Sequence, residues 1–292
     1  MRERFNSDTV FSIVVYFLAF SSAALVLYPL VFVVSASFSD PSLILNGEII
    51  LFPKGVNLNS YRAILSNDNV LTGYTNTIFY SVASTFYSMF LTTCAAYALS
   101  KPNLRGNNFL TVMITLTMFF GGGMIPTFLN LNNLGMLNTR AVMIIPAAMS
   151  ATNFIIMRNF FIHSVPKELL ESAHIDGASE LRTLGQVVLP LSRSILGVLT
   201  VFYMSSNWNA FFNALIYLSD DRLMPLQVFL RRILMFASVM DGMGTGDALG
   251  DVLLFEGLRY ALICVSTLPM LLIYLLIQKS FKKGFLMGSI KG

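Results

Sequence analysis

Long apolar segments alternate with short polar segments along the whole chain. A membrane-crossing helix needs roughly 20 apolar residues, and uncharged stretches of about that kind fall at 10–36, 75–100, 107–128, 141–162, 194–217 and 259–278. Another apolar stretch, at 223–240, has Arg231 and Arg232 in its middle. Because a pair of arginines at the bilayer centre costs several kcal/mol, we expect an interfacial helix there. The pattern predicts an all-α integral membrane protein with six transmembrane helices.

The composition supports a membrane protein and excludes two other classes. Of the 292 residues, 55% are hydrophobic and 12% are charged, whereas soluble domains carry about 25% charged residues. Cys94 and Cys264 lie in apolar runs, which favours small buried side chains over a disulfide framework. The net charge of +4 comes without a soluble domain that could hold a basic patch. We therefore expect no nucleic-acid partner.

The distribution of basic residues predicts that both termini are cytoplasmic, since Lys and Arg gather in cytoplasmic loops. This orientation places twelve of the 19 basic residues inside; the seven outside are Lys54, Arg62, Arg140, Arg222, Arg231, Arg232 and Arg259. A cleaved signal peptide over 1–37 is the alternative for the first segment. Its apolar run is about twice as long as a normal signal-peptide core, so we expect a retained span and a single integral domain over 1–292.

The polar segment at 163–193 lies between the fourth and fifth predicted spans and is therefore expected in the cytoplasm. Pro166 suits the first turn of a helix, and Glu168 and Glu171 follow near that end, where the helix dipole favours anions. Gly177 is expected to end or bend this helix. A second helix is predicted from about Ser179 to Leu189, with Pro190 fixing its exit into the next span.

Spacing alone leaves the role of this segment open between a solvated loop and a docking surface. Its small residues would allow a second protein surface to approach closely; they are Ser172, Ala173, Gly177, Ala178 and Ser179. The run from Glu171 to Ala178, followed by Leu189-Pro190, resembles the coupling loop of ATP-binding-cassette (ABC) importer permeases, which reads E-A-A, three residues, G, and later an apolar-Leu-Pro ending. Ser172 departs from the usual alanine of that motif, but it is similarly small.

Other parts of the chain resemble permeases of carbohydrate importers as well. The matching segments are Trp208–Phe212 with Leu215–Leu218, the glycine-rich tail Lys283–Gly292, and Gly121–Phe128 with Asn133–Thr139. The last two runs look like a branch that handles complex oligosaccharides. The resemblance covers essentially the whole chain and implies the type I importer permease fold.

The resemblance implies a function and a set of partners in the bacterial cytoplasmic membrane. The chain would form half of the transmembrane pathway for a sugar or oligosaccharide, beside a second, different permease subunit. Two ATP-binding subunits would use ATP and Mg, and an extracytoplasmic solute-binding protein would deliver the substrate. The chain has no G-x-x-x-x-G-K-[ST] phosphate loop, so we expect it to bind no cofactor itself. The coupling residues implied are Glu168, Glu171, Ser172, Ala173, Asp176, Gly177, Ala178 and Pro190.

Two further features are assigned roles under this resemblance. The outer loop at 218–258 is acidic and rich in glycine, and we expect it either to contact the binding protein or to be a solvated loop. Polar and aromatic side chains within the spans are candidates for the substrate path, because sugars need hydrogen bonds and flat apolar surfaces. These are Asn76, Tyr80, Tyr87, Asn153, Tyr203, Asn207, Trp208 and Asn209. Interfacial aromatic belts and helix-joining asparagines are the alternatives for these residues.

Three other functions remain as alternatives with different strengths. An intramembrane enzyme is disfavoured because the only histidines, His163 and His174, both lie in the polar segment and no metal-ligand or nucleophile motif occurs. An ion-coupled carrier usually buries a charged residue near the membrane centre, and no predicted span has one there. An ABC importer for a non-sugar solute is the closer alternative, since such permeases also carry the coupling motif.

Overall fold

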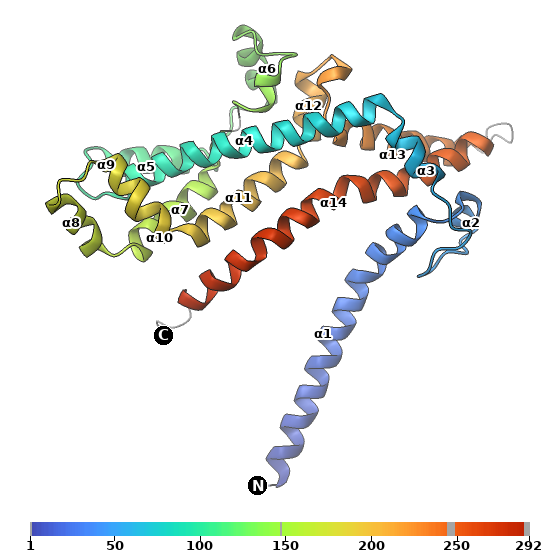
Figure 1. Cartoon of the computed structure of the whole chain (residues 1–292), viewed down its shortest axis with the longest axis horizontal. Coiled ribbons are helices and arrows are strands. Elements are labelled where there is room, and N and C mark those ends of the chain that lie inside the picture. The colour runs from blue at the N-terminus through green and yellow to red at the C-terminus, as the bar shows by residue number, and fades with distance from the viewer. Residues whose placement is uncertain (1, 147, 244–248, 289–292) are drawn as a thin grey trace. The chain divides into compact units, whose positions relative to one another are not determined.

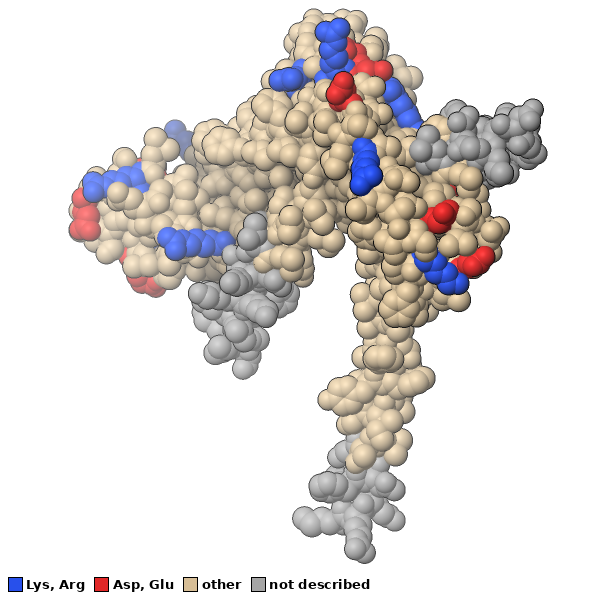
Figure 2. All heavy atoms as spheres, turned by 45° about the vertical axis from the view of Figure 1, so that its right-hand side comes forward, with Lys and Arg blue, Asp and Glu red and all other residues tan. Residues whose placement is uncertain are grey.

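The computed structural model describes residues 2–146, 148–243 and 249–288, and every regular element in these ranges is a helix. This confirms the all-α prediction. The chain forms two compact units, one from Met1–Val70 and Leu230–Thr267, the other from Leu71–Phe229 and Leu268–Gly292. The prediction of a single integral domain stays a prediction. Charged side chains on the face in Figure 2 gather in separate clusters with wide uncharged surfaces between them, as expected of membrane-facing helices.

The first unit contains a long apolar helix and a small packed loop. Helix α1 (Arg2–Ser37) is followed by α2 (Pro41–Leu45) and α3 (Asn59–Leu65) (Figure 1). The part of α13 (Leu226–Met243) from Leu230 onward and the first half of α14 (Leu249–Gly288) complete the unit. The buried residues of this core include Ala36, Ile44 and Ile49. Asp40 accepts a hydrogen bond from the backbone N–H of Ser42 and so caps α2.

The second unit is built around the long helix α4 (Asp68–Ser100), which packs with α7 (Ala151–Ser164) and α11 (Arg193–Trp208) (Figure 1). Fully buried Phe154, Met157 and Leu199 are at the centre of their shared core. A second core joins α6 (Met124–Asn133), the 3-10 turn η1 (Arg140–Met143), α12 (Phe211–Tyr217) and the start of α13 (Leu226–Met243). Because α4 contacts elements from distant parts of the sequence, it organises this unit.

Three of the predicted spans are continuous helices. Within the described residues, Thr9–Ser37, Asp68–Ser100 and Phe255–Leu275 are long and apolar enough to cross a membrane. Glu180–Leu191 and Arg193–Trp208 pass the same test together, although their axes differ by 86°. A helix also exists at the predicted interfacial segment, where α13 begins after Pro225. The number of six spans and the interfacial position of α13 stay predictions.

The other three predicted spans are wrong as continuous helices. The segment 107–128 divides into α5 (Asn107–Leu116) and α6 around three glycines, of which Gly123 has a φ of 84°. The segment 141–162 begins in a 3-10 turn and becomes α-helical only at Ala151, and Pro146, which lacks an N–H donor, lies between the two. The segment 194–217 breaks at Asn209 and Ala210, between α11 and α12. A prediction based only on the length of apolar runs does not detect these interruptions.

The first turns of α4 hold the segment between α12 and α13 by three side chains. Asn76 Nδ2 donates to the carbonyls of Arg222 and Met224 at 2.7 and 3.2 Å, and the Tyr80 hydroxyl donates to the Leu223 carbonyl at 2.9 Å. The backbone N–H of Leu226 donates to Thr77 Oγ1 at 2.8 Å. These bonds satisfy backbone groups at 222–226 that have no partner within a helix of their own.

Gly73 sits where α4 meets α13, and it allows the two backbones to approach. A Cβ at this position would lie 2.8 Å from Phe229 Cδ2 and 3.2 Å from Leu226 Cα. We expect Gly73→Ala to lower the free energy of unfolding by about 1–3 kcal/mol, because extra atoms in a packed site force shifts. Gly121→Ala is the matched control, since nothing lies within 4 Å of its Cβ. Thermal unfolding of both variants in detergent checks this, and equal midpoints would contradict it.

Candidate coupling site

The polar segment at 163–193, which we call the coupling segment, begins with a helix that has no buried residue. This helix, α8, spans Lys167–Ile175. Pro166 stands one position before it, as the N-cap with an extended ψ of 131°, and not within the first turn as expected. Leu170 packs against the core of the second unit, which orients the helix. Ile175, at the other end, is 86% exposed.

The structure explains why glycine follows this helix. Gly177 has a φ of 71°, in the left-handed region that favours glycine. Its N–H donates to the His174 carbonyl at 3.1 Å, and the N–H of Ala178 donates to the Ala173 carbonyl at 2.9 Å. These two bonds form a Schellman motif, which satisfies carbonyls at the end of a helix. The predicted end of the helix at Gly177 is thus confirmed.

The second helix of the coupling segment exists, but it is not uniform. Ser179 Oγ accepts from the N–H of Arg182 and caps α9 (Glu180–Thr183). A π-helical stretch, η2 (Leu184–Val188), and the short α10 (Leu189–Leu191) continue it. Pro190 lacks the N–H that an α-helical ladder would need at this point. The chain then turns at Ser192 into α11, at the 86° bend.

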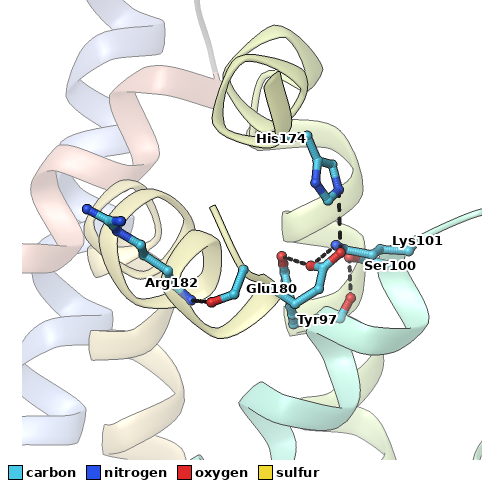
Figure 3. A network of polar contacts seen from close by, with 7 residues as sticks. Tyr97, Ser100, Lys101, His174, Glu180 and Arg182 are labelled. Atoms are coloured by element: carbon cyan, nitrogen blue, oxygen red, sulfur yellow. Dashed lines mark hydrogen bonds and ion pairs between the residues drawn. The ribbon is translucent and has the colours of Figure 1, made fainter. Parts of the chain in front are cut away.

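A single carboxylate joins the two helices of the coupling segment to α4 (Figure 3). Glu180 Oε2 accepts hydrogen bonds from the Tyr97 hydroxyl at 2.7 Å and from Lys101 Nζ. His174 Nε2 lies 3.4 Å from the other oxygen, Oε1. The hydrogen bond from Lys101, with that from Tyr97, lowers the pKa of Glu180 below its ordinary value. The carboxylate is therefore ionised at neutral pH.

Glu180, Lys101 and Tyr97 were not among the residues expected from the sequence. A signal was present, because Lys101 begins the short turn after one predicted span and Glu180 is the acid beside the helix-capping Ser179. Opposite charges in two turns on the same predicted side of the membrane can pair. Sequence spacing does not bring them together, however, since 79 positions separate the two residues.

The predicted coupling residues are mostly presented on the surface. The exposed members of the set are Glu168, Glu171, Ser172, Asp176, Gly177 and Pro190, while Ala173 and Ala178 are half-buried. The structure brings all of these except Pro190 together on or directly after α8. The arrangement offers small, acidic and apolar groups to another surface, and nothing within 4 Å would meet a Cβ on Gly177.

The predicted substrate-path residues are spread over the second unit. Asn76, Tyr80, Asn153, Tyr203 and Trp208 are buried, Tyr87 and Asn207 are half-buried, and Asn209 is exposed. The Tyr203 hydroxyl lies 2.7 Å from Thr92 Oγ1 and accepts from the N–H of Ser150 at 3.1 Å. Asn207 donates to Thr85 at 3.4 Å. Internal partners thus hold several of these side chains, and their contact with substrate stays a prediction.

The second unit contains an apolar groove of about 620 Å³. It lies along α4, the second helix of the coupling segment and α11, and includes Phe86, Phe90 and Leu181. None of the predicted substrate-path residues lines it. A groove lined mainly by apolar side chains, with only a few threonine hydroxyls, suits acyl chains or apolar side chains better than sugar hydroxyls. No cluster of His, Cys, Asp or Glu in the described ranges could hold a metal ion.

Long apolar helices, together with an exposed helix that is followed by Gly177, are features expected of a transport permease. The chain is 38% identical over 289 residues to the polygalacturonan/rhamnogalacturonan transport system permease protein YtcP of Bacillus subtilis, covering 98% of this chain and 99% of that protein. It is 36% identical over 270 residues to the protein LplC of the same organism, covering 92% and 90%. No protein-family model matches.

A solved structure agrees with these relatives. The crystal structure of a bacterial ABC transporter involved in the import of the acidic polysaccharide alginate superposes with a TM-score of 0.85. It has 34% sequence identity over 94% of this chain and 98% of that chain. The chain therefore belongs to the sugar ABC transporter permease family. Like its relatives it is a multi-pass membrane transport subunit and not itself an enzyme, and its family implies ATPase and binding-protein partners.

Proposed function

We propose that this chain is one of two different permease subunits in an importer for oligosaccharides of acidic polysaccharides. Two ATPase subunits would bind ATP and Mg in the cytoplasm, and an extracytoplasmic binding protein would deliver the substrate. Both termini would be cytoplasmic, as the distribution of basic residues predicts. The observation that carries the proposal is the 38% identity, over nearly the full length, to a polygalacturonan/rhamnogalacturonan permease, together with the likeness to an alginate importer.

The coupling segment is the part of the chain that we propose to contact the ATPase subunits. Its first helix has no buried residue and exposes Ile175 beside Asp176 and Gly177. The segment continues directly into the helices α7 and α11. A displacement of α8 by a closing ATPase pair would therefore reach the membrane helices. The ATPase pair must bind the outward-facing and inward-facing states with different affinity for this displacement to shift their populations.

The external binding protein requires a contact surface, and the acidic segment at 218–258 is our proposal for it. Its first part lies on the 3-10 turn η3 (Asp221–Leu223), where Asp220 accepts from the N–H of Arg222. Asn138 Oδ1 accepts from the N–H groups of Ser219 and Asp220 at 2.9 Å. Gly244 and Gly246, which also belong to the predicted loop, lie outside the described residues. The C-terminal tail, a second proposed ATPase contact, ends outside them as well.

The substrate class can be tested by competition between sugars. The purified assembly of this chain with its second permease, ATPase and binding protein is reconstituted in liposomes that contain ATP. We expect labelled oligogalacturonate to accumulate and unlabelled malto-oligosaccharide to compete poorly. Preferred uptake of malto-oligosaccharide would reject the acidic substrate class, and preferred uptake of an amino acid or peptide would favour a non-sugar importer.

Asn209 is the proposed substrate-path residue with the most accessible side chain. It lies at the break between α11 and α12, and its amide donates to the Ser205 carbonyl at 2.8 Å. We expect Asn209→Ala to raise the KM for uptake roughly three- to tenfold, the equivalent of one lost hydrogen bond. Asn108→Ala, at an exposed position after the turn 101–106, is the control. An unchanged KM in Asn209→Ala would remove this residue from the path.

A further inference from the structure

The coupling segment contacts α4 through side chains, because the backbone does not lead directly from one to the other. Covalently, the segment continues only into α7 on one side and α11 on the other. Tyr97 and Lys101, at the end of α4, are 83 and 79 positions away from Glu180. The bonds of the Glu180 carboxylate are therefore a connection that the covalent chain does not provide.

The two oxygens of Glu180 have partners on different elements. Oε2 accepts from Tyr97 and Lys101 of α4 and its following turn, whereas Oε1 faces His174 of α8 (Figure 3). His174 lies inside the motif that we propose to contact the ATPase. One carboxylate thus spans from the contact helix to a membrane helix. The bond from Lys101 is charge-assisted, and together with the 3.4 Å contact to His174 it forms a polar path between α8 and α4.

The end of α4 to which Glu180 is bound is itself tied to two other helices. Arg158 Nε on α7 donates to the Leu99 carbonyl at 2.7 Å, which caps the end of α4 with a cation. Asn107, at the start of α5, donates to the carbonyls of Leu99 and Lys101 at 3.1 and 2.6 Å. A displacement that reaches Lys101 is therefore passed to α4, α5 and α7 together.

We propose that Glu180 is a positioning residue that couples movement of α8 to α4, in addition to the path through α7 and α11. The inference rests on the proposed contact between α8 and the ATPase subunits. It assigns a transport role to a residue outside the contact motif itself. Glu180 would change how much transport each ATP molecule drives, and not whether the ATPase binds.

An ordinary surface ion pair would not have this effect, and the chain contains one for comparison. Lys54 Nζ lies 3.7 Å from Glu48 Oε2, with both side chains about half exposed, and the pair joins residues six positions apart in one loop. Such exposed pairs contribute little. The Glu180 side chain is half exposed as well, but its carboxylate has three partners on two other elements, and Lys101 is only 28% exposed.

The test measures transport and ATP hydrolysis separately in the reconstituted full assembly. We expect Glu180→Gln to lower the ratio of sugar imported to ATP hydrolysed by about fivefold or more, the lower end of typical coupling between sites. Tyr97→Phe removes one donor and should lower the ratio less. Glu48→Gln is the matched control and should leave it unchanged. The amount of ATPase that co-purifies should be equal in all variants.

Exchanging the charges of Glu180 and Lys101 distinguishes loss of this ion pair from a general structural effect of the substitutions. Glu180→Lys and Lys101→Glu should each lower the ratio, and the double variant should recover part of it, because contacting residues are not additive. An unchanged ratio in Glu180→Gln, or a double variant no better than either single variant, would overturn the inference. If the wild-type assembly itself shows no ATP-dependent import, the proposed function fails instead, which keeps the two failures distinguishable.

Discussion

Replacing Gly177 with aspartate is expected to abolish sugar import while the protein still inserts into the membrane. The φ of 71° at this position ends α8 in a Schellman motif. A non-glycine residue there costs about 1–2 kcal/mol, and aspartate less than most residues. That strain is small beside the proposed second effect, a charged side chain at a surface where we expect close contact with the ATPase. Uptake and ATPase stimulation, measured in the same vesicles, should both be lost.

Gly47 provides a matched control for the backbone strain. It has the same φ of 71°, and nothing lies within 4 Å of a Cβ at either glycine. Gly47→Asp therefore introduces the same residue into the same conformation on the opposite side of the predicted topology. We expect this variant to transport nearly normally. Equal loss in both variants would assign the effect to backbone strain, and normal uptake by Gly177→Asp would reject the coupling role.

The second large effect is expected at Ile175, whose side chain is 86% exposed at the end of α8. If this side chain is buried on an ATPase subunit, Ile175→Asp removes apolar contact and places an unpaired charge in the interface. The combined loss should be about 2–4 kcal/mol, or roughly 30- to 700-fold in affinity. Titration of the ATPase subunit against membranes containing each variant measures this directly.

Leu65 is the control for an exposed apolar residue. It ends α3 and is 62% exposed, and the predicted topology places it on the other side of the membrane from α8. Leu65→Asp should leave ATPase affinity unchanged, because the residue has no part in the proposed contact. An Ile175→Asp variant that binds the ATPase as tightly as Leu65→Asp would show that α8 docks through other side chains.

Local sequence signals were sufficient to place the coupling segment. A glycine after a short amphipathic run predicted the end of α8 at Gly177, and the next helix was predicted from about Ser179, which caps α9 in the structure. These features depend on backbone conformation and capping within a few residues. The long helices α1, α4 and α14 could also be predicted from the sequence, because their apolar runs are long and contain no glycine cluster.

The parts that the sequence did not reveal depend on contacts between distant residues or on small local breaks. The glycines 121–123 and Pro146 interrupt two apolar runs that average hydrophobicity treats as continuous. Asn76 and Tyr80, which are predicted to line the substrate path, also hold backbone carbonyls at 222–224, a contact that the sequence does not show. The bond between Lys101 and Glu180 joins two loops whose pairing only the packing of the helices defines.

The most direct test of the account compares transport with and without the ATPase subunits. Purified chain and its partner permease are reconstituted in liposomes with the binding protein and labelled oligosaccharide, with or without the ATPase and ATP. Import should occur only when ATPase and ATP are both present, and it should stop when hydrolysis is blocked. Accumulation against a gradient by the permease subunits alone would contradict the account, because it would show that the membrane helices contain their own source of energy.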